Sequence, residues 1–180
     1  MIDRSNFFAK ARANLFGGAM TQSQVDGCNA ILDGWEWRPE LTDRRWLAYM
    51  LATAKHETAH TMQPIAEYGH GAGRPYGVAV NGRVFYGRGY VQLTWAVNYS
   101  KMAALTGVDL VGNPDLALDP KIAALIMFEG MKGGLFTGVS LARYFDATHD
   151  DPINARRIIN GTDRAHEIAA IHAGFLGALL

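Results

Sequence analysis

The chain has 180 residues, 49% of them hydrophobic, which is long enough to bury one substantial core. Its 17 basic and 17 acidic residues cancel and are scattered, so the composition argues against a nucleic-acid-binding or anionic-membrane-binding surface. A single cysteine, Cys28, excludes an internal disulfide and suits a reducing cytoplasm. We therefore expect a single domain over residues 1–180, without a separate binding module, and a monomer.

The two ends of the chain carry no targeting signal of the usual kind. Residues 1–10 contain acidic and basic side chains and lack the apolar segment of a secretory signal, so no signal peptide is expected. The apolar residues 168–180 are interrupted by His172, Gly174 and Gly177 and are fewer than the roughly 20 that span a bilayer. We expect a packed helix there and no stable membrane insertion; a tail that disturbs membranes is the alternative.

The first helical signal follows Thr21. Thr21 and Gln24 have the spacing of a capping box, and apolar residues then recur at helical intervals until about Gly34. A second helix begins after Thr42 or Asp43 and is expected to run toward residue 60, before Pro64 stops it. Glu57 is thereby predicted in the last turns of a buried helix.

The period of the pattern changes between residues 78 and 86. Two short β-type runs flank Asn81-Gly82, a pair that tolerates positive φ at both central positions of a primed turn, so a β-hairpin is predicted. Helical patterns resume over residues 94–105 with Gly107 as a stop, and again over 119–131, 152–159 and 163–180. The expected fold is α+β and predominantly α-helical, with one small hairpin flanking a cleft.

Two carboxylates are candidates for acid–base chemistry. Glu57 ends the apolar helix, whereas Glu67 lies in a polar loop beyond Pro64, near Arg74. Inverting cleavage of a glycosidic bond needs one protonated carboxylic acid and one carboxylate that activates water. Since burial disfavours a charged carboxylate, we expect Glu57 to serve as the acid and Glu67 as the base. Taken alone, two carboxylates ten positions apart are better explained as surface charges.

Residues 56–60 read HETAH and match the zinc-binding pattern H-E-x-x-H. A catalytic zinc needs a third protein ligand, and the longer metzincin spacing places Ala66 where a third histidine is required. The helix is also cut short by Pro64. A zinc peptidase is therefore an alternative, and His56 and His60 are expected instead to orient Glu57 or to line the cleft.

The segment after the predicted hairpin is rich in glycine and aromatic residues. Residues 85–95 read FYGRGYVQLTW and precede Asn98 and Tyr99. This segment closely resembles the signature of glycoside hydrolase family 19 chitinases and their phage endolysin relatives. The resemblance extends to residues 56–58 (HET), 113–116 (NPDL) and 158–161 (IING), in the same order along the chain.

The resemblance implies a lysozyme-like helical fold and a role for several residues. It implies that Glu57 is the catalytic acid and Glu67 the base, and that Thr94 holds the attacking water. It implies no cofactor and no metal. Glycines in the loop allow close approach of a sugar, and amide and aromatic side chains suit acetamido groups and pyranose rings. The expected substrate-binding residues are His56, Tyr86, Arg88, Gln92, Trp95, Asn98, Tyr99, Asn160 and Arg164.

Three of these residues have structural alternatives. Thr94 fits a helix N-cap, Asn160 a helix C-terminus before Gly161, and Arg164 a surface charge. These roles are compatible with function.

The chain also departs from the plant-type pattern. Disulfide-forming cysteines and a chitin-binding module are absent, and only ten positions separate Glu57 from Glu67, which implies an open cleft. The resemblance therefore favours a phage endolysin that hydrolyses the β-1,4 bonds of the peptidoglycan glycan strand with inversion. It implies accumulation in the host cytoplasm, holin-dependent release and action at the cell wall. A chitinase is the close alternative, and a glycan-binding module without activity is disfavoured by the two glutamates and Thr94.

Overall fold

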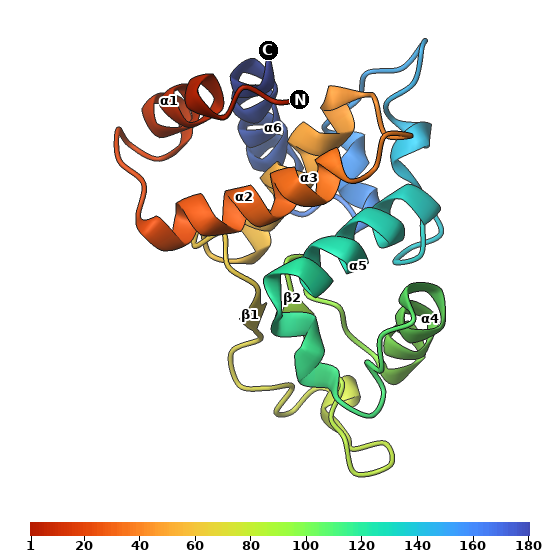
Figure 1. Ribbon diagram of the computed structural model, residues 1–180. Helices are drawn as coiled ribbons and strands as arrows, with labels where there is room; N and C mark the ends of the chain where they lie inside the picture. The colour runs from red at the N-terminus through yellow and green to blue at the C-terminus, as the bar shows by residue number, and fades with distance from the viewer.

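Six α-helices and a two-stranded sheet make up the computed structural model, which describes all 180 residues (Figure 1). Four short 3₁₀ helices connect them. The elements are α1 (Arg4–Leu15), α2 (Gln22–Glu36), α3 (Arg44–Glu57), β1 (Ile65–Ala66), η1 (Pro75–Gly77), β2 (Arg88–Gly89), α4 (Ala96–Thr106), η2 (Pro114–Leu118), α5 (Pro120–Gly133), η3 (Leu141–Arg143), η4 (Asn154–Ile158) and α6 (Ala165–Leu179). The predicted α+β, mostly helical class is confirmed.

Local capping signals explain where several helices begin and end. The Thr21 hydroxyl accepts a hydrogen bond from the Gln24 amide at 3.2 Å, and the Gln24 side chain accepts one from the Thr21 amide at 2.9 Å. Asp43 caps α3 by accepting from the Arg45 amide. Gly107 ends α4 with φ 72°, a conformation that glycine adopts without strain. These predicted boundaries are confirmed within two residues.

The core is organised around α3. Every residue of α3 from Leu47 to Lys55 is buried, because α6 packs along the helix and the other elements surround it. In turn α6 packs on α1, and α2 lies beside α5 (Figure 1). Helix α1 was not predicted; Asp3 caps it, and the ring of Phe7 stacks on Phe175 with centroids 6.1 Å apart. This packing fixes the end of α3 from several sides.

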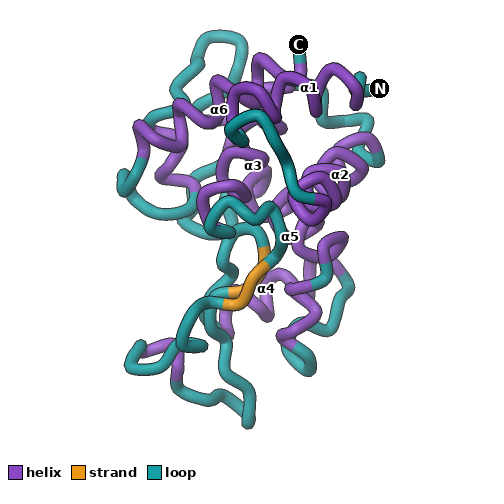
Figure 2. The backbone as a smooth tube through the Cα atoms, turned by 90° about the vertical axis from the view of Figure 1, so that its left-hand side faces the viewer, coloured by secondary structure: helices purple, strands orange, loops and turns teal.

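The β-hairpin predicted over residues 78–86 is wrong: the expected turn forms, but the two expected strands do not. Asn81 and Gly82 do form the turn, with φ of 50° and 74°, but only the pair Val80 and Arg83 forms a bridge. Val80 is 47% exposed and has no second layer to pack against. The sheet instead pairs β1 with β2, antiparallel, with Ile65 opposite Gly89. Figure 2 shows these two strands between the helical body and the long loop that connects them.

Two further boundaries differ from expectation. Helix α3 ends at Glu57 rather than near residue 60, because Ala59 and His60 adopt left-handed conformations with φ of 49° and 67°. The segment expected as a helix over 152–159 is the 3₁₀ helix η4. None of the helices combines the length and the apolar character needed to cross a membrane.

Candidate active site

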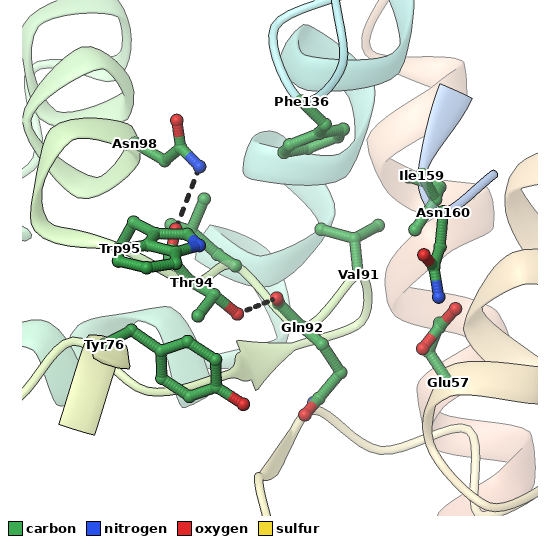
Figure 3. Close-up of a pocket in the computed structure, with 11 residues that line it drawn as sticks. Glu57, Tyr76, Val91, Gln92, Thr94, Trp95, Asn98, Phe136, Ile159 and Asn160 are labelled. Carbon is green, nitrogen blue, oxygen red and sulfur yellow. Dashed lines mark hydrogen bonds between the residues drawn. The ribbon is translucent and has the colours of Figure 1, made fainter. Parts of the chain in front are cut away.

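A cleft of about 400 Å³ opens beside the end of α3. Figure 3 shows Glu57 and Asn160 on one side of it and Tyr76 and Trp95 on the other, with Gln92 between them. Six of the residues predicted for the site line it. The full lining comprises Glu57, Tyr76, Val91, Gln92, Leu93, Thr94, Trp95, Asn98, Phe136, Ile159 and Asn160.

Glu57 is held by a buried arginine. Nη1 of Arg156 donates to Oε1 of Glu57 at 2.5 Å, and Nε of Arg156 donates to the Asp163 carbonyl at 3.0 Å. The side chains of Arg156 and Glu57 are 3% and 16% exposed. Glu57 thus ends an apolar helix as predicted, but a guanidinium charge faces its carboxyl group.

The resemblance implies a substrate-binding role for Arg164. Arg164 instead lies at the surface, with its side chain 66% exposed and 3.7 Å from Glu167. Arg164 is therefore a surface charge, the alternative that the sequence left open. Sequence reasoning missed Arg156 because residues 156 and 157 are both arginine and no local pattern tells which one is buried. Only the tertiary contact between η4 and the end of α3 separates them.

Glu67 follows β1 and has both carboxylate oxygens engaged. The Tyr76 hydroxyl donates to Oε1 at 2.7 Å, and the Gly87 amide donates to Oε2 at 3.0 Å. The hydrogen bond to Glu67 raises the pKa of Tyr76 above its ordinary value. Donors of this kind favour the ionised carboxylate. Because Tyr76 lines the cleft, it connects Glu67 to the cleft wall, whereas the expected neighbour Arg74 makes no hydrogen bond to Glu67.

Thr94 lies in the turn that leads from β2 into α4. Its hydroxyl donates to the Gln92 carbonyl at 2.7 Å, which leaves the oxygen lone pairs free to accept a hydrogen bond from water. Thr94 does not cap α4, because that helix begins at Ala96 and its N-cap residue, Trp95, makes no side-chain capping bond. The N-cap alternative is therefore wrong. Thr94 presents an acceptor to the cleft, as a water-orienting residue requires.

The amide side chains of the cleft are partly used by the backbone. Nε2 of Gln92 donates to the carbonyls of Ile65 and Gly89, at 3.1 and 3.2 Å, and so ties the turn to β1. Nδ2 of Asn98 donates to the Thr94 carbonyl at 2.9 Å. Their oxygens, Oε1 and Oδ1, remain as acceptors. Gln92 therefore offers a sugar only an acceptor, whereas Asn98 keeps one N–H donor as well as its acceptor.

Trp95 and Asn160 are the exposed members of the lining. Trp95 is 47% exposed and lies edge-on to Tyr76, with ring centroids 5.5 Å apart. Its backbone has φ 75°, a strained conformation for a bulky residue that costs about 1–3 kcal/mol. Asn160 points toward Glu57 in Figure 3. An amide beside the carboxyl group and an indole across the cleft from it form a combination suited to a sugar ring with polar substituents.

Other predicted binding residues lie behind the cleft. Arg88 is 5% exposed and Tyr99 is fully buried, and neither lines the cleft. Nε of Arg88 pairs with Asp115 at 2.8 Å, while its guanidinium carbon lies 3.5 Å from the centre of the Tyr86 ring. The Tyr99 hydroxyl donates to the Tyr86 carbonyl at 2.9 Å. Arg88, Tyr86 and Tyr99 therefore support the glycine-rich segment from behind the cleft.

The histidines of the H-E-x-x-H pattern do not share a helical face. Helix α3 ends at Glu57, so His60 lies outside it. Nδ1 of His56 is 3.6 Å from Oε1 of Glu167, and Nδ1 of His60 is 3.1 Å from Nζ of Lys55. No group of three histidine, cysteine, aspartate or glutamate side chains is placed to hold a metal. The helical arrangement on which the zinc-peptidase alternative depends is therefore absent.

The chain matches a family described as class I chitinases, glycoside hydrolase family 19, over residues 40–129. Endochitinase 2 of Gossypium hirsutum is 33% identical over 102 residues, which cover 47% of this chain and 34% of that protein. Endochitinase 1 of Theobroma cacao is 51% identical over 43 residues, which cover 23% of this chain and 13% of that protein. The matched part thus spans about a third or less of the curated relatives.

Solved structures resemble the whole chain. A bacterial family 19 chitinase superimposes with a TM-score of 0.59 at 22% identity, covering 99% of this chain and 94% of that one. Chitinase C from Streptomyces griseus HUT6037 superimposes with a TM-score of 0.54 at 20% identity, covering 97% of this chain and 88% of that one. These structures share the fold, and half of the chain matches the family in sequence. The chain therefore belongs to glycoside hydrolase family 19.

Proposed function

We propose that the chain is an inverting glycoside hydrolase that cleaves β-1,4 bonds between N-acetylated hexosamines. The observation that carries this proposal is the placement of Glu57 in a cleft whose other side holds Tyr76, the hydrogen-bond partner of Glu67. One carboxyl group, that of Glu57, faces the cleft across from the exposed indole of Trp95, and the other is connected through Tyr76 to the same wall as Trp95. The family membership supports the same reaction class.

The environments divide the roles between the two carboxyl groups. Glu67 accepts two hydrogen bonds, an arrangement that suits an ionised base. Thr94 offers an acceptor to the water that such a base activates. Glu57 would then donate its proton to the leaving oxygen, while Arg156 fixes the carboxyl group through Oε1 and leaves Oε2 for the substrate. No step requires a cofactor.

A chain of N-acetylglucosamine is the substrate that the relatives favour. The curated relatives named endochitinase and the bacterial family 19 chitinase bear names that state this activity. The lining of the cleft agrees in character, because Glu57 is its only charged residue and the rest are aromatic, amide, hydroxyl or aliphatic side chains. An uncharged acetamido glycan therefore meets no repulsive group other than the acid itself.

Peptidoglycan is the second candidate, and two arginines favour it. Arg74 and Arg157 are exposed, neither forms an ion pair with a carboxylate, and each lies within three positions of a lining residue, Tyr76 or Asn160. Peptidoglycan strands carry lactyl and peptide carboxylates that such cations attract. Cleavage of that polymer would support the role of a phage endolysin, stored in the host cytoplasm and released through a holin to the cell wall.

The proposal is tested by proton NMR of the first products from a soluble β-1,4-linked N-acetylglucosamine oligomer. Inversion requires the α-anomer to appear before mutarotation, and initial formation of the β-anomer would contradict the mechanism. Rates on peptide-bearing peptidoglycan fragments, measured in parallel, separate the two substrates. An Arg74→Ala, Arg157→Ala double variant should lose activity only on the peptide-bearing fragments if the arginines contribute.

A further inference from the structure

Three buried side-chain atoms in the molecule have no hydrogen-bond partner; two of them belong to α3 and one to α6, and these two helices pack on each other. They are the hydroxyl oxygens of Tyr49 and Thr53 and Nε2 of His172. Their residues are 0%, 1% and 3% exposed. The rings of Tyr49 and His172 are in contact, with centroids 5.8 Å apart. Buried polar atoms in proteins are almost always satisfied, so a concentration of exceptions in one interface requires an explanation.

The two hydroxyl groups are in line with the catalytic acid. Tyr49, Thr53 and Glu57 are spaced four residues apart on α3, so their side chains form one row along one face of the helix. Thr53 lies one turn from Glu57 and Tyr49 lies two turns away. The row is polar within a helix whose other buried positions from Leu47 to Ala54 are apolar.

Arg156 connects the row to the acid. Its guanidinium is buried and bonds Glu57 through Nη1 and the Asp163 carbonyl through Nε, which leaves Nη2 without a protein partner. Burial raises the pKa of Tyr49; the nearby charge of Arg156 lowers it, and that of Glu57 raises it. The Tyr49 hydroxyl therefore lies within electrostatic reach of both members of the ion pair.

We propose that Tyr49 and Thr53 are positioning residues for Glu57, which act through internal water to hold Arg156 in the orientation that directs the carboxyl group into the cleft. The proposal rests on the proposed glycosidase function. A buried water needs about three polar partners. Thr53 and Tyr49 supply unpaired hydroxyl groups one and two turns from Glu57 on α3, and the guanidinium of Arg156, which bonds Glu57, carries further N–H donors. Both hydroxyls can accept from water or donate to it, so they adapt to a fixed cation.

The test uses isosteric variants that remove only a hydroxyl group. Thr53→Val and Tyr49→Phe keep side-chain shape, and Thr53→Ser keeps the hydroxyl. Tyr90→Phe is the matched control, since Tyr90 is also fully buried but its hydroxyl lies 3.5 Å from the Gly27 carbonyl. The measurements are kcat and KM on a soluble N-acetylglucosamine oligomer, together with thermal unfolding to verify that each variant is folded.

For Thr53→Val and Tyr49→Phe we expect kcat to fall about tenfold with KM unchanged, as loss of an interaction specific to the transition state requires. Thr53→Ser and Tyr90→Phe should match the wild type.

Wild-type kcat in folded Thr53→Val would overturn the inference. Equal losses in Thr53→Val and Thr53→Ser would do so as well, because packing rather than the hydroxyl would then be responsible. An inactive wild-type protein would instead refute the proposed function itself. If Tyr49→Phe does not fold, the comparison of Thr53→Val with Thr53→Ser tests the inference on its own.

Discussion

Arg156 and Glu57 form an ion pair 99 positions apart in the chain, with Nη1 and Oε1 separated by 2.5 Å and both side chains largely buried. The pair joins the end of α3 to η4, and it therefore joins the candidate acid to the wall that carries Asn160. Geometry at Glu57 and stability of the helical body are coupled through this contact.

Replacing Arg156 should destabilise the protein strongly. Arg156→Ala leaves the Glu57 carboxylate buried without a partner, and breaking such a pair costs about 3–5 kcal/mol. The exposed neighbour provides the control: Arg157→Ala should change the free energy of unfolding by no more than about 0.5 kcal/mol. Urea unfolding at pH 7 measures both values, and equal losses in the two variants would contradict the buried ion pair.

The double variant Arg156→Ala, Glu57→Gln separates the charge from the packing. Removing the carboxylate along with its partner leaves no uncompensated ion, so the double variant should be more stable than Arg156→Ala alone. Urea unfolding of the double variant completes a double-mutant cycle with the wild type and the two single variants. Strictly additive losses would show that the two charges do not interact.

Glu57→Gln should remain folded and lose hydrolysis. The amide is nearly isosteric but cannot donate the proton, so kcat should fall at least about a hundredfold. Glu40→Gln is a suitable control, because Glu40 is exposed and its only ion pair, with Lys132, is a surface contact of 3.4 Å. Activity of Glu57→Gln above a few per cent of the wild type would remove Glu57 from the role of acid.

Tyr76→Phe should impair the base without altering the fold. It deletes the hydroxyl that donates to Oε1 of Glu67 at 2.7 Å, and loss of one such hydrogen bond predicts a fall in kcat of roughly tenfold. Tyr68→Phe is the matched control, because Tyr68 is the exposed neighbour of Glu67 in sequence and makes no hydrogen bond to it. Similar kcat values for the two variants would argue against Tyr76 as the support of Glu67.

Stability should decline as the pH falls below 6.5. Burial lowers the pKa of His172 from its ordinary value of 6.5, and burial together with Lys55 lowers that of His60. The unfolded chain therefore binds these protons first, so stability is complete above pH 6.5 and is lost below it. Carboxyl groups with a lowered pKa, such as Glu36 with its ordinary value of 4.5, contribute only at lower pH.

Urea unfolding at pH 7 and pH 5.5 measures this loss. The contribution of each histidine is at most about 1.4 kcal/mol per pH unit. His172→Gln should reduce the pH dependence, whereas His166→Gln, which alters an exposed residue of α6, should leave it as in the wild type. If the free energy of unfolding depends on pH equally in the two variants, His172 is not a source of the stability loss.

Much of the helical framework could be predicted from the sequence, because its signals are local. Thr21 with Gln24, Asp43 and Gly107 act within one turn of the helices that they bound. The pairing of β1 with β2 could not be predicted, since it joins residues 65–66 to residues 88–89 across a long loop. The local signal at Asn81 located a turn but not the sheet.

The site shows the same contrast between local signals and contacts of residues distant in sequence. Residues of the segment from Gln92 to Asn98 line the cleft because they are consecutive in the chain, and their pattern marks them together. Burial of Arg88 and Tyr99 and the contact of Arg156 with Glu57 depend on neighbours that are distant in sequence. The pattern of residue types therefore identified the segment. It did not distinguish the residues that line the cleft from those that are buried behind it.

Glu57-dependent glycoside hydrolysis is tested most directly by mass spectrometry of fragments released from chitin and from purified peptidoglycan, after borohydride reduction and with a chelator present. We expect newly reduced N-acetylated hexosamine ends, which form whether or not the chelator is present and are absent with Glu57→Gln. Intact glycan strands with cut peptides, or release that the chelator abolishes, would contradict a Glu57-dependent glycosidase.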